Sequence, residues 1–234
     1  MAIQLEIIYM LNKQGLIVHK PMVLLLGIPV LLTPIEPSLL WPLFLFLLMM
    51  TWISITFRSN GDSCEQLMAT ILAGVAIPAL FSGLLIIRSI GDDGTGFALT
   101  TILLLMVWAN DILAFIGGKS MGKHQLAPKI SPNKTVEGFI WGFLGCFIAL
   151  ALGMAILPDY PLSLKLSIPF AALVGIFGPA GDLAESKLKR ICDIKDSSGM
   201  MPGHGGLYDR FDAILFAAPA AAIYLKILTN FSIL

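Results

Sequence analysis

Long runs of apolar residues dominate the pattern of this 234-residue chain. A helix needs roughly 20 apolar residues to cross the ~30 Å hydrocarbon core of a bilayer. Most of the runs meet this length with no charge or with one Asp near an end; the first and the last are shorter. They are residues 21–35, 38–57, 66–87, 96–116, 138–157, 164–184 and 213–225. The pattern predicts an all-α, polytopic integral membrane protein with about seven transmembrane helices.

Composition supports a surface that faces lipid. Only 13% of the residues are charged, about half the usual share in a soluble domain. The net charge of zero gives no general attraction to nucleic acid. Three widely separated cysteines form no CxxC pair, so neither a disulfide framework nor a thiolate metal site is indicated. Glu6 interrupts the first apolar residues, which argues against a cleavable signal peptide.

The basic residues predict the orientation in the membrane. Lys and Arg are enriched in cytosolic loops, and here they concentrate in the loops 117–135 and 185–210. If both loops are cytosolic, alternation of the spans leaves only Arg88, Lys165 and Lys226 away from that side. This arrangement predicts a cytosolic N-terminus and a C-terminus on the opposite side. No polar linker divides the chain, so one integral domain is expected.

Two carboxylates lie within the apolar runs. Asp111 and Asp182 each stand near the cytosolic end of a span, about one helical turn inside it. A charged side chain costs about 2.5–3.5 kcal/mol at mid-bilayer. Each Asp could simply reach the interface or pair with a lysine of the adjoining loop. Two of them at the same depth, each before a basic loop, favour a functional site.

The first basic loop has features that suit an anion. Its glycines and lysines expose backbone N–H groups and positive charge to phosphate. Ser131 before Pro132 predicts a helix N-terminus, which also attracts anions. The spacing does not match a Walker A loop. A positive-inside loop with ordinary helix capping is the alternative interpretation.

The second basic loop is more specific. On a helix, Asp182 shares a face with Ser186, and Asp209 shares one with Asp212. Three carboxylates near a loop rich in cations suit Mg²⁺, which also binds phosphates. The glycine-rich turn 203–206 permits close approach of a ligand to the backbone. These features predict a metal, nucleotide and phosphate site at the cytosolic interface.

At these residues the chain resembles the CDP-diacylglycerol synthases, or phosphatidate cytidylyltransferases. The signature of that family stands here as Ser186, Lys189-Arg190, Lys195-Asp196, Pro202 to Gly206 and Asp209-Arg210-Phe211-Asp212. Asp111 and the stretches 122–128 and 131–138 are also similar to the family. Met201 departs from the usual Leu, Ile or Phe, and the region before residue 60 is shorter than in many relatives. The resemblance assigns residues 1–95 to N-terminal transmembrane helices and 96–234 to a catalytic transmembrane region.

The resemblance implies an enzyme that joins CTP to phosphatidate, giving CDP-diacylglycerol and pyrophosphate in the bacterial inner membrane. It implies that Asp182 and Asp209 share a Mg²⁺ ion, with Asp212 as a further ligand. It assigns Lys189, Arg190 and Arg210 to phosphate groups, and Ser186 to a phosphate or a metal-bound water. The remaining expected substrate-binding residues are Asp111, Ser131, Asn133, Lys134, Lys195, His204, Gly205 and Gly206. His204 could instead stabilise the turn.

Other interpretations stay open at this point. The chain could be a related CTP-dependent transferase or kinase that acts on another lipid, or a catalytically silent relative. Gly and Pro within the spans, as at Gly178-Pro179, could instead mark the broken helices of a transporter. A second, monovalent cation and a homodimer are also left open.

Overall fold

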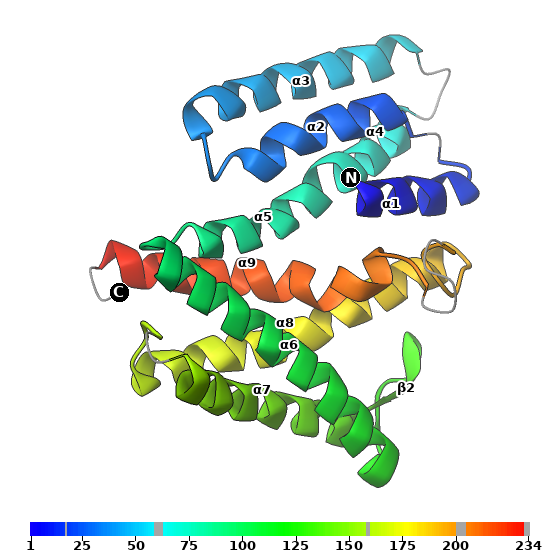
Figure 1. Cartoon of the computed structure of the whole chain (residues 1–234). Helices are drawn as coiled ribbons and strands as arrows, with labels where there is room; N and C mark the ends of the chain where they lie inside the picture. The colour runs from blue at the N-terminus through cyan, green and yellow to red at the C-terminus, as the bar shows by residue number, and fades with distance from the viewer. Residues whose placement is uncertain (17, 59–62, 158–159, 200–204, 232–234) are drawn as a thin grey trace. The chain divides into compact units, whose positions relative to one another are not determined.

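The computed structural model describes residues 1–16, 18–58, 63–157, 160–199 and 205–231. Helices make up most of this part of the chain (Figure 1). In chain order the elements are α1 (Ala2–Lys13), α2 (Lys20–Leu32), α3 (Pro37–Arg58), α4 (Ser63–Ile71), the π-helix η1 (Leu72–Ala76), α5 (Ile77–Arg88), α6 (Asp93–Met121), β1 (Gln125–Ala127), β2 (Ser131–Thr135), α7 (Val136–Ile156), α8 (Leu164–Ile191) and α9 (Tyr208–Asn230). The prediction of an all-α polytopic membrane protein is confirmed.

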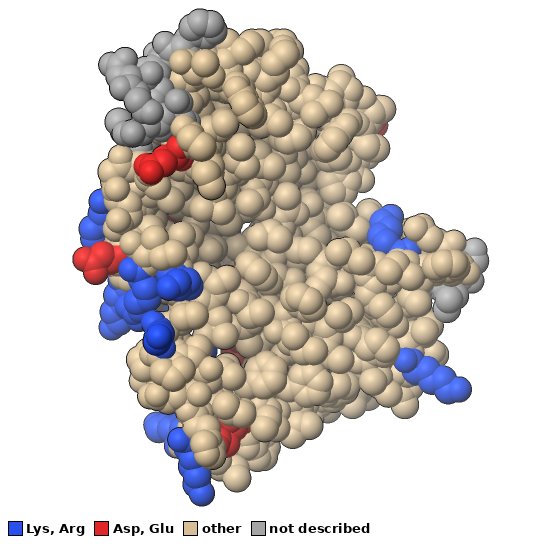
Figure 2. Space-filling model, turned by 180° about the vertical axis from the view of Figure 1, so that it is seen from behind, with Lys and Arg blue, Asp and Glu red and all other residues tan. Residues whose placement is uncertain are grey.

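Within the described residues, six helical segments are long and apolar enough to cross a membrane. They are Pro37–Thr56, Cys64–Arg88, Asp93–Met121, Val136–Ile156, Leu164–Ile191 and Tyr208–Asn230. Such helices satisfy their own backbone hydrogen bonds, which hydrocarbon cannot do. The space-filling view shows a broad uncharged surface that few charged side chains interrupt (Figure 2).

The expected count of seven spans is not reached in the described part of the chain. The run 21–35 forms α2, a helix of 13 residues and therefore about 20 Å long, which is short of the hydrocarbon thickness. Thr33 and Pro34, after the last helical residue, begin the turn that leads into α3. The apolar pattern predicts a span from the run 21–35, but the helix that this run forms is too short to cross the hydrocarbon core.

The chain divides into two compact units. One unit contains residues 1–82 and 188–210, and the other contains residues 83–187 and 211–234. The chain passes between them within α5, α8 and α9. The division into residues 1–95 and 96–234 that the resemblance implies differs from these two units and stays a prediction.

The unit of residues 83–187 and 211–234 has a continuous apolar core. Fully buried side chains from α6, α7, α8 and α9 form it, among them Leu99, Cys146, Phe170 and Leu225. Three glycines of α7 bring that helix very close to α6. A Cβ atom at Gly138, Gly142 or Gly145 would lie 2.8 Å from a backbone oxygen of α6. Small residues of this kind let membrane helices pack closely.

We expect Gly142→Ala to destabilise the protein. The added methyl group would press on the Asn110 carbonyl oxygen, and such overpacking costs about 1–3 kcal/mol. This corresponds to a fall of about 2–10 °C in the unfolding temperature, measurable in detergent by tryptophan fluorescence. Gly178→Ala is the matched control, because the nearest atom to a Cβ there is 3.9 Å away. Equal unfolding temperatures for the two variants would contradict this packing.

The unit of residues 1–82 and 188–210 packs α2 against α3 and η1, with α1 beside them (Figure 1). A buried glutamine of α1 joins these elements. The Gln4 side-chain amide donates to the carbonyl oxygens of Val23 and Ala73, each at 3.2 Å. Ala73 lies in the π-helix, where the regular helical hydrogen-bond pattern is interrupted. Gln4 therefore fixes α1 to both α2 and η1.

Two local expectations from the sequence were wrong. Ser131 does not begin a helix, because residues 131–135 pair with 125–127 as an antiparallel hairpin. Helix α7 begins only at Val136, and Thr135 is its N-cap. In addition, α6 and α8 continue well beyond the apolar runs, to Met121 and Ile191. Asp111 and Asp182 are therefore more than one turn from their helix ends.

Candidate active site

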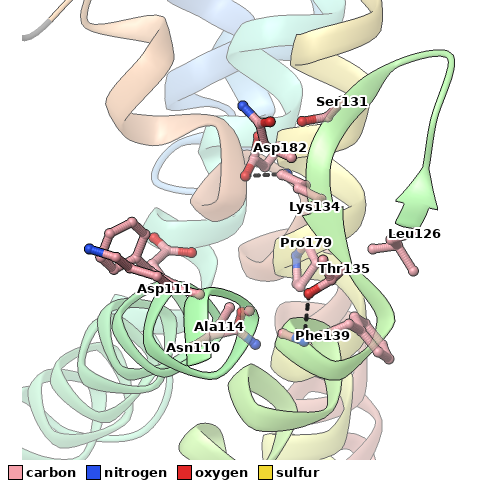
Figure 3. Close-up of a pocket in the computed structure, with 15 residues that line it drawn as sticks. Asn110, Asp111, Ala114, Leu126, Ser131, Lys134, Thr135, Phe139, Pro179 and Asp182 are labelled. Atoms are coloured by element: carbon pink, nitrogen blue, oxygen red, sulfur yellow. Dashed lines mark hydrogen bonds and ion pairs between the residues drawn. The ribbon is translucent and has the colours of Figure 1, made fainter. Parts of the chain in front are cut away.

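A pocket of about 460 Å³ is lined by the C-terminal part of α6, by Pro179 and Asp182 of α8, by the β-hairpin and by the start of α7 (Figure 3). Its size is typical of small-ligand sites. Helix α6 contributes Asn110 and Asp111, and α8 contributes Asp182. The other lining residues are Ala114, Phe115, Gly118, Lys119, Leu126, Ser131, Asn133, Lys134, Thr135, Gly138, Phe139 and Pro179. All of them belong to the unit of residues 83–187 and 211–234.

The pocket contains a central ion pair. Lys134 Nζ of β2 contacts Asp182 Oδ2 of α8, and Figure 3 shows the two side chains pointing at each other. Both side chains are partly exposed, at 25% and 34%. Ser186 Oγ donates to Asp182 Oδ1 at 3.4 Å, as the helical spacing predicts. The hairpin therefore brings a cation to the Asp of α8.

Local hydrogen bonds place Lys134 in the pocket. Thr135 Oγ1 caps α7 by accepting from Gly138 N at 3.1 Å. Glu137 accepts from the backbone nitrogens of Lys123 and His124 at 3.0 and 3.2 Å, and its Oε1 lies 2.6 Å from His124 Nδ1. Glu137 thus joins the base of the hairpin to the start of α7. This explains how a short, polar loop presents Lys134 and Ser131 to one cavity.

Three carboxylates gather beside the ion pair. Ligand oxygens of Asp182, Glu185 and Asp212 lie within 4.8 Å of one another. Glu185 is 1% exposed, and Asp212 lies in the part of α9 that belongs to this unit, which begins at Phe211. Close approach of three acids is unfavourable without compensating positive charge. Carboxylate oxygens at this spacing are a donor set that Mg²⁺ accepts.

Asp209 lies in the other unit, in a dense hydrogen-bond network. Its Oδ1 contacts Lys189 Nζ at 2.8 Å. Its Oδ2 accepts from Ser197 N at 3.1 Å, Ser197 Oγ at 2.9 Å and Gly206 N at 2.6 Å. The Asp209 and Lys189 side chains are only 12% and 15% exposed. The shared metal ligation by Asp182 and Asp209 is not tested by these contacts and stays a prediction.

Most of the remaining expected site residues lie at the surface. Arg190, Lys195 and Arg210 are exposed, as are Asp111 and Asn133. Gly205 has a φ of 77°, a left-handed conformation that favours glycine. His204 lies outside the described residues.

Two buried acids of these networks were missed at the level of sequence. Glu185 follows Asp182 by one helical turn, so the i, i+3 rule could have found it. Glu6 is 2% exposed and accepts hydrogen bonds from residues about 200 positions away. Its only sequence signal was a lone acid in an apolar helix.

Comparison with known proteins identifies the family. The model of the cytidylyltransferase family matches residues 2–228. This chain belongs to the cytidylyltransferase family. The phosphatidate cytidylyltransferase of Staphylococcus saprophyticus is 36% identical over 179 residues, which cover 76% of this chain and 68% of that protein. The Bacillus subtilis protein of the same name is 38% identical over 183 residues, or 76% and 64% of the two chains.

A shorter stretch is more similar still. The phosphatidate cytidylyltransferase of Staphylococcus aureus is 45% identical over 121 residues, 52% of this chain and 46% of that protein. Membership of the cytidylyltransferase family confirms the resemblance seen in the signature residues.

Proposed function

We propose that this protein transfers CMP from CTP to phosphatidate, releasing pyrophosphate and leaving CDP-diacylglycerol in the membrane. The observation that carries the proposal is the pocket that joins Lys134 and Asp182 to a cluster of carboxylates. The names of the relatives support the choice of substrates. The apolar helices around the polar site suit a lipid whose tails remain in the bilayer.

The proposed reaction forms one bond and breaks one. A phosphate oxygen of phosphatidate attacks the α-phosphorus of CTP, and the bond from that phosphorus to the oxygen of the leaving pyrophosphate breaks. A phosphate monoester has its second pKa near 6, so the nucleophile is already an anion and needs no strong base. The protein must mainly position two anions and neutralise their charge.

The residues suit these tasks. We assign Lys134, Lys189, Arg190 and Arg210 to phosphate groups. The two lysines pair with Asp182 and Asp209, and the two arginines are exposed cations at the end of α8 and the start of α9. Ser186 donates to Asp182 in the structure and is assigned to orienting that carboxylate or a phosphate. The wider set of substrate contacts includes Asp111, Ser131, Asn133, Lys195, Gly205 and Gly206.

The carboxylate donors fit a Mg²⁺ ion, and we propose that Asp182 and Asp212 hold it with Glu185. The close spacing of three acids supports this, since a divalent cation would offset their repulsion. When bound, Mg²⁺ would polarise the phosphoryl oxygens and stabilise the charge of the transition state. The sharing of this ion with Asp209 stays a prediction from the sequence.

The position of the label on CTP tests the proposed function. The purified protein in detergent is incubated with Mg²⁺, phosphatidate and CTP labelled at either the α- or the γ-phosphate. We expect a labelled lipid from α-labelled CTP and labelled pyrophosphate from γ-labelled CTP. A lipid labelled from the γ-phosphate would instead indicate a kinase. Product with another lipid phosphate and none with phosphatidate would overturn the substrate assignment.

We further propose that the pocket faces the cytosol. The positive-inside distribution of Lys and Arg supports this orientation, which also gives the site access to CTP. Cys64 is an exposed natural probe close to the loop before α4, whereas Cys146 and Cys192 are buried.

We expect a membrane-impermeant maleimide to label Cys64 in inside-out vesicles and not in intact cells. The reason is that the proposed topology places the loop near residue 60 on the cytosolic side. Labelling is measured by the mass shift of the purified protein, with Cys64→Ser as the control for reaction elsewhere. Labelling from the outside of intact cells would reverse the proposed orientation.

A further inference from the structure

The Glu6 carboxylate of α1 is a buried acceptor with four donors among the residues that the structure describes. It accepts from Leu207 N at 2.8 Å, Tyr208 N at 2.7 Å, Ser198 Oγ at 2.5 Å and Ser197 Oγ at 3.3 Å. Glu6 is only 2% exposed. Burying a carboxylate is costly unless hydrogen bonds replace its water. These hydrogen bonds therefore hold the Glu6 side chain in place, and they also hold the donors of the segment 188–210 in place.

Two of these donors stand at the start of α9. Tyr208 is its first residue and Leu207 precedes it. The first N–H groups of a helix have no partner within the helix, and the helix dipole favours a negative charge there. Glu6 thus caps α9 from a distant part of the sequence. The next residue of α9 is Asp209.

A serine connects Glu6 directly to the Asp209 network. Ser197 Oγ contacts Glu6 Oε2 at 3.3 Å and Asp209 Oδ2 at 2.9 Å. Gly206 fills the same space: a Cβ atom there would overlap Ser197 Oγ and lie 2.7 Å from Glu6 Oε1. Close packing leaves little room for Asp209 to shift while Glu6 stays in place.

Helix α1, which carries Glu6, is itself held in place by hydrogen bonds. Two residues earlier, Gln4 is 3% exposed and binds the carbonyl oxygens of Val23 and Ala73. One end of α1 therefore holds both the N-terminal helices and the loop that contains the family signature. The N-terminal part of the chain contributes more than hydrophobic spans.

We infer that Glu6 is a positioning residue for the transfer reaction: it holds Ser197 and the start of α9, and through them sets the place of Asp209 and Lys189. The expected effect of Glu6 on the reaction rate rests on the proposed function. Its structural consequence, a loop that is fixed by α1, is independent of the reaction.

Glu6→Gln is the sharpest variant because it keeps the size of the side chain and removes its charge. The new amide group would face backbone N–H donors that already need acceptors. We expect kcat to fall about 10- to 100-fold, since displacement of a catalytic group by about 1 Å has effects of this size. The KM for CTP is expected to change less, because Glu6 is buried away from solvent. Glu65→Gln is the matched control, an exposed glutamate of the same unit.

Cys192 provides a readout that does not depend on activity. It belongs to the segment 188–210 and is 1% exposed, and burial raises the pKa of its thiol. In a Cys64→Ser background, we expect Glu6→Gln to speed maleimide labelling of Cys192 while Cys146, which is buried in the other unit, stays protected. Glu65→Gln should change neither.

The two readouts separate the possible failures. If the parent protein has no transferase activity but Cys192 becomes reactive in Glu6→Gln, the proposed function fails and the fixed loop stands. If the parent is active and Glu6→Gln retains its kcat with Cys192 protected, the inference is overturned. Equal exposure of Cys146 and Cys192 would show general unfolding and would also overturn a positioning role.

Discussion

Replacing Asp182 by Asn is expected to abolish CMP transfer while the protein remains folded. Asp182 is the residue at which the lysine of the hairpin, the hydroxyl of Ser186 and the carboxylate cluster meet. Asparagine keeps the shape and removes the charge that would bind Mg²⁺ and balance Lys134. Loss of several kcal/mol of charge stabilisation corresponds to a fall in kcat of about 100-fold or more.

The measurement is the rate of labelled lipid formation as a function of Mg²⁺ concentration. Asp93→Asn serves as the control, because Asp93 is fully exposed and its pair with Arg88 lies at the surface; its rate should match the parent. Glu185→Gln should cause a loss similar to Asp182→Asn if both hold one ion. Full activity of Asp182→Asn at saturating Mg²⁺ would rule out its assignment as a metal ligand.

Replacing Asp209 by Asn is expected to abolish transfer and, in addition, to loosen the loop. Both carboxylate oxygens of Asp209 accept hydrogen bonds, one from Lys189 and the other from Ser197 and Gly206. An asparagine in either orientation turns its NH₂ group toward donors. Removing one partner of a buried ion pair costs about 3–5 kcal/mol of folding stability, which would loosen the loop. Displacement of reacting groups by about 1 Å lowers rates by about 100-fold, so kcat should fall by about 100-fold or more.

Maleimide labelling distinguishes the two aspartates. In the Cys64→Ser background, Cys192 should become reactive in Asp209→Asn and stay protected in Asp182→Asn. This difference is expected because Asp209 accepts hydrogen bonds from Ser197 and Gly206 of the segment 188–210, which contains Cys192, whereas Asp182 belongs to the other unit. Protection of Cys192 in both variants would show that Asp209 acts in the reaction without holding the loop.

Local rules accounted for much of the candidate site. The i, i+4 spacing of Asp182 and Ser186 predicted their contact, and the hydrogen bond is present. The expected helix start at Ser131 failed, because pairing with residues 125–127 competes with capping. A Ser-Pro pair favours a helix N-terminus but cannot reveal a strand partner.

Long-range partners were beyond such rules. The spacing of Asp209 and Asp212 placed both on one face of α9. The structure places Asp212 in a cluster with Asp182 and Glu185, and it places Asp209 in a network with Lys189 and Ser197. Glu6 had no visible role in the sequence, since its partners are far along the chain.

The sequence by itself determined that the chain is a helical membrane protein and which family signature it carries. Hydropathy is a property of contiguous residues, and a bilayer selects apolar runs by length; a signature is likewise read along the chain. Only the tertiary structure decided which acids gather with Asp182 and that Glu6 binds the loop before α9. Those outcomes depend on how helices pack and which buried polar groups find partners, and these contacts join residues far apart in the sequence.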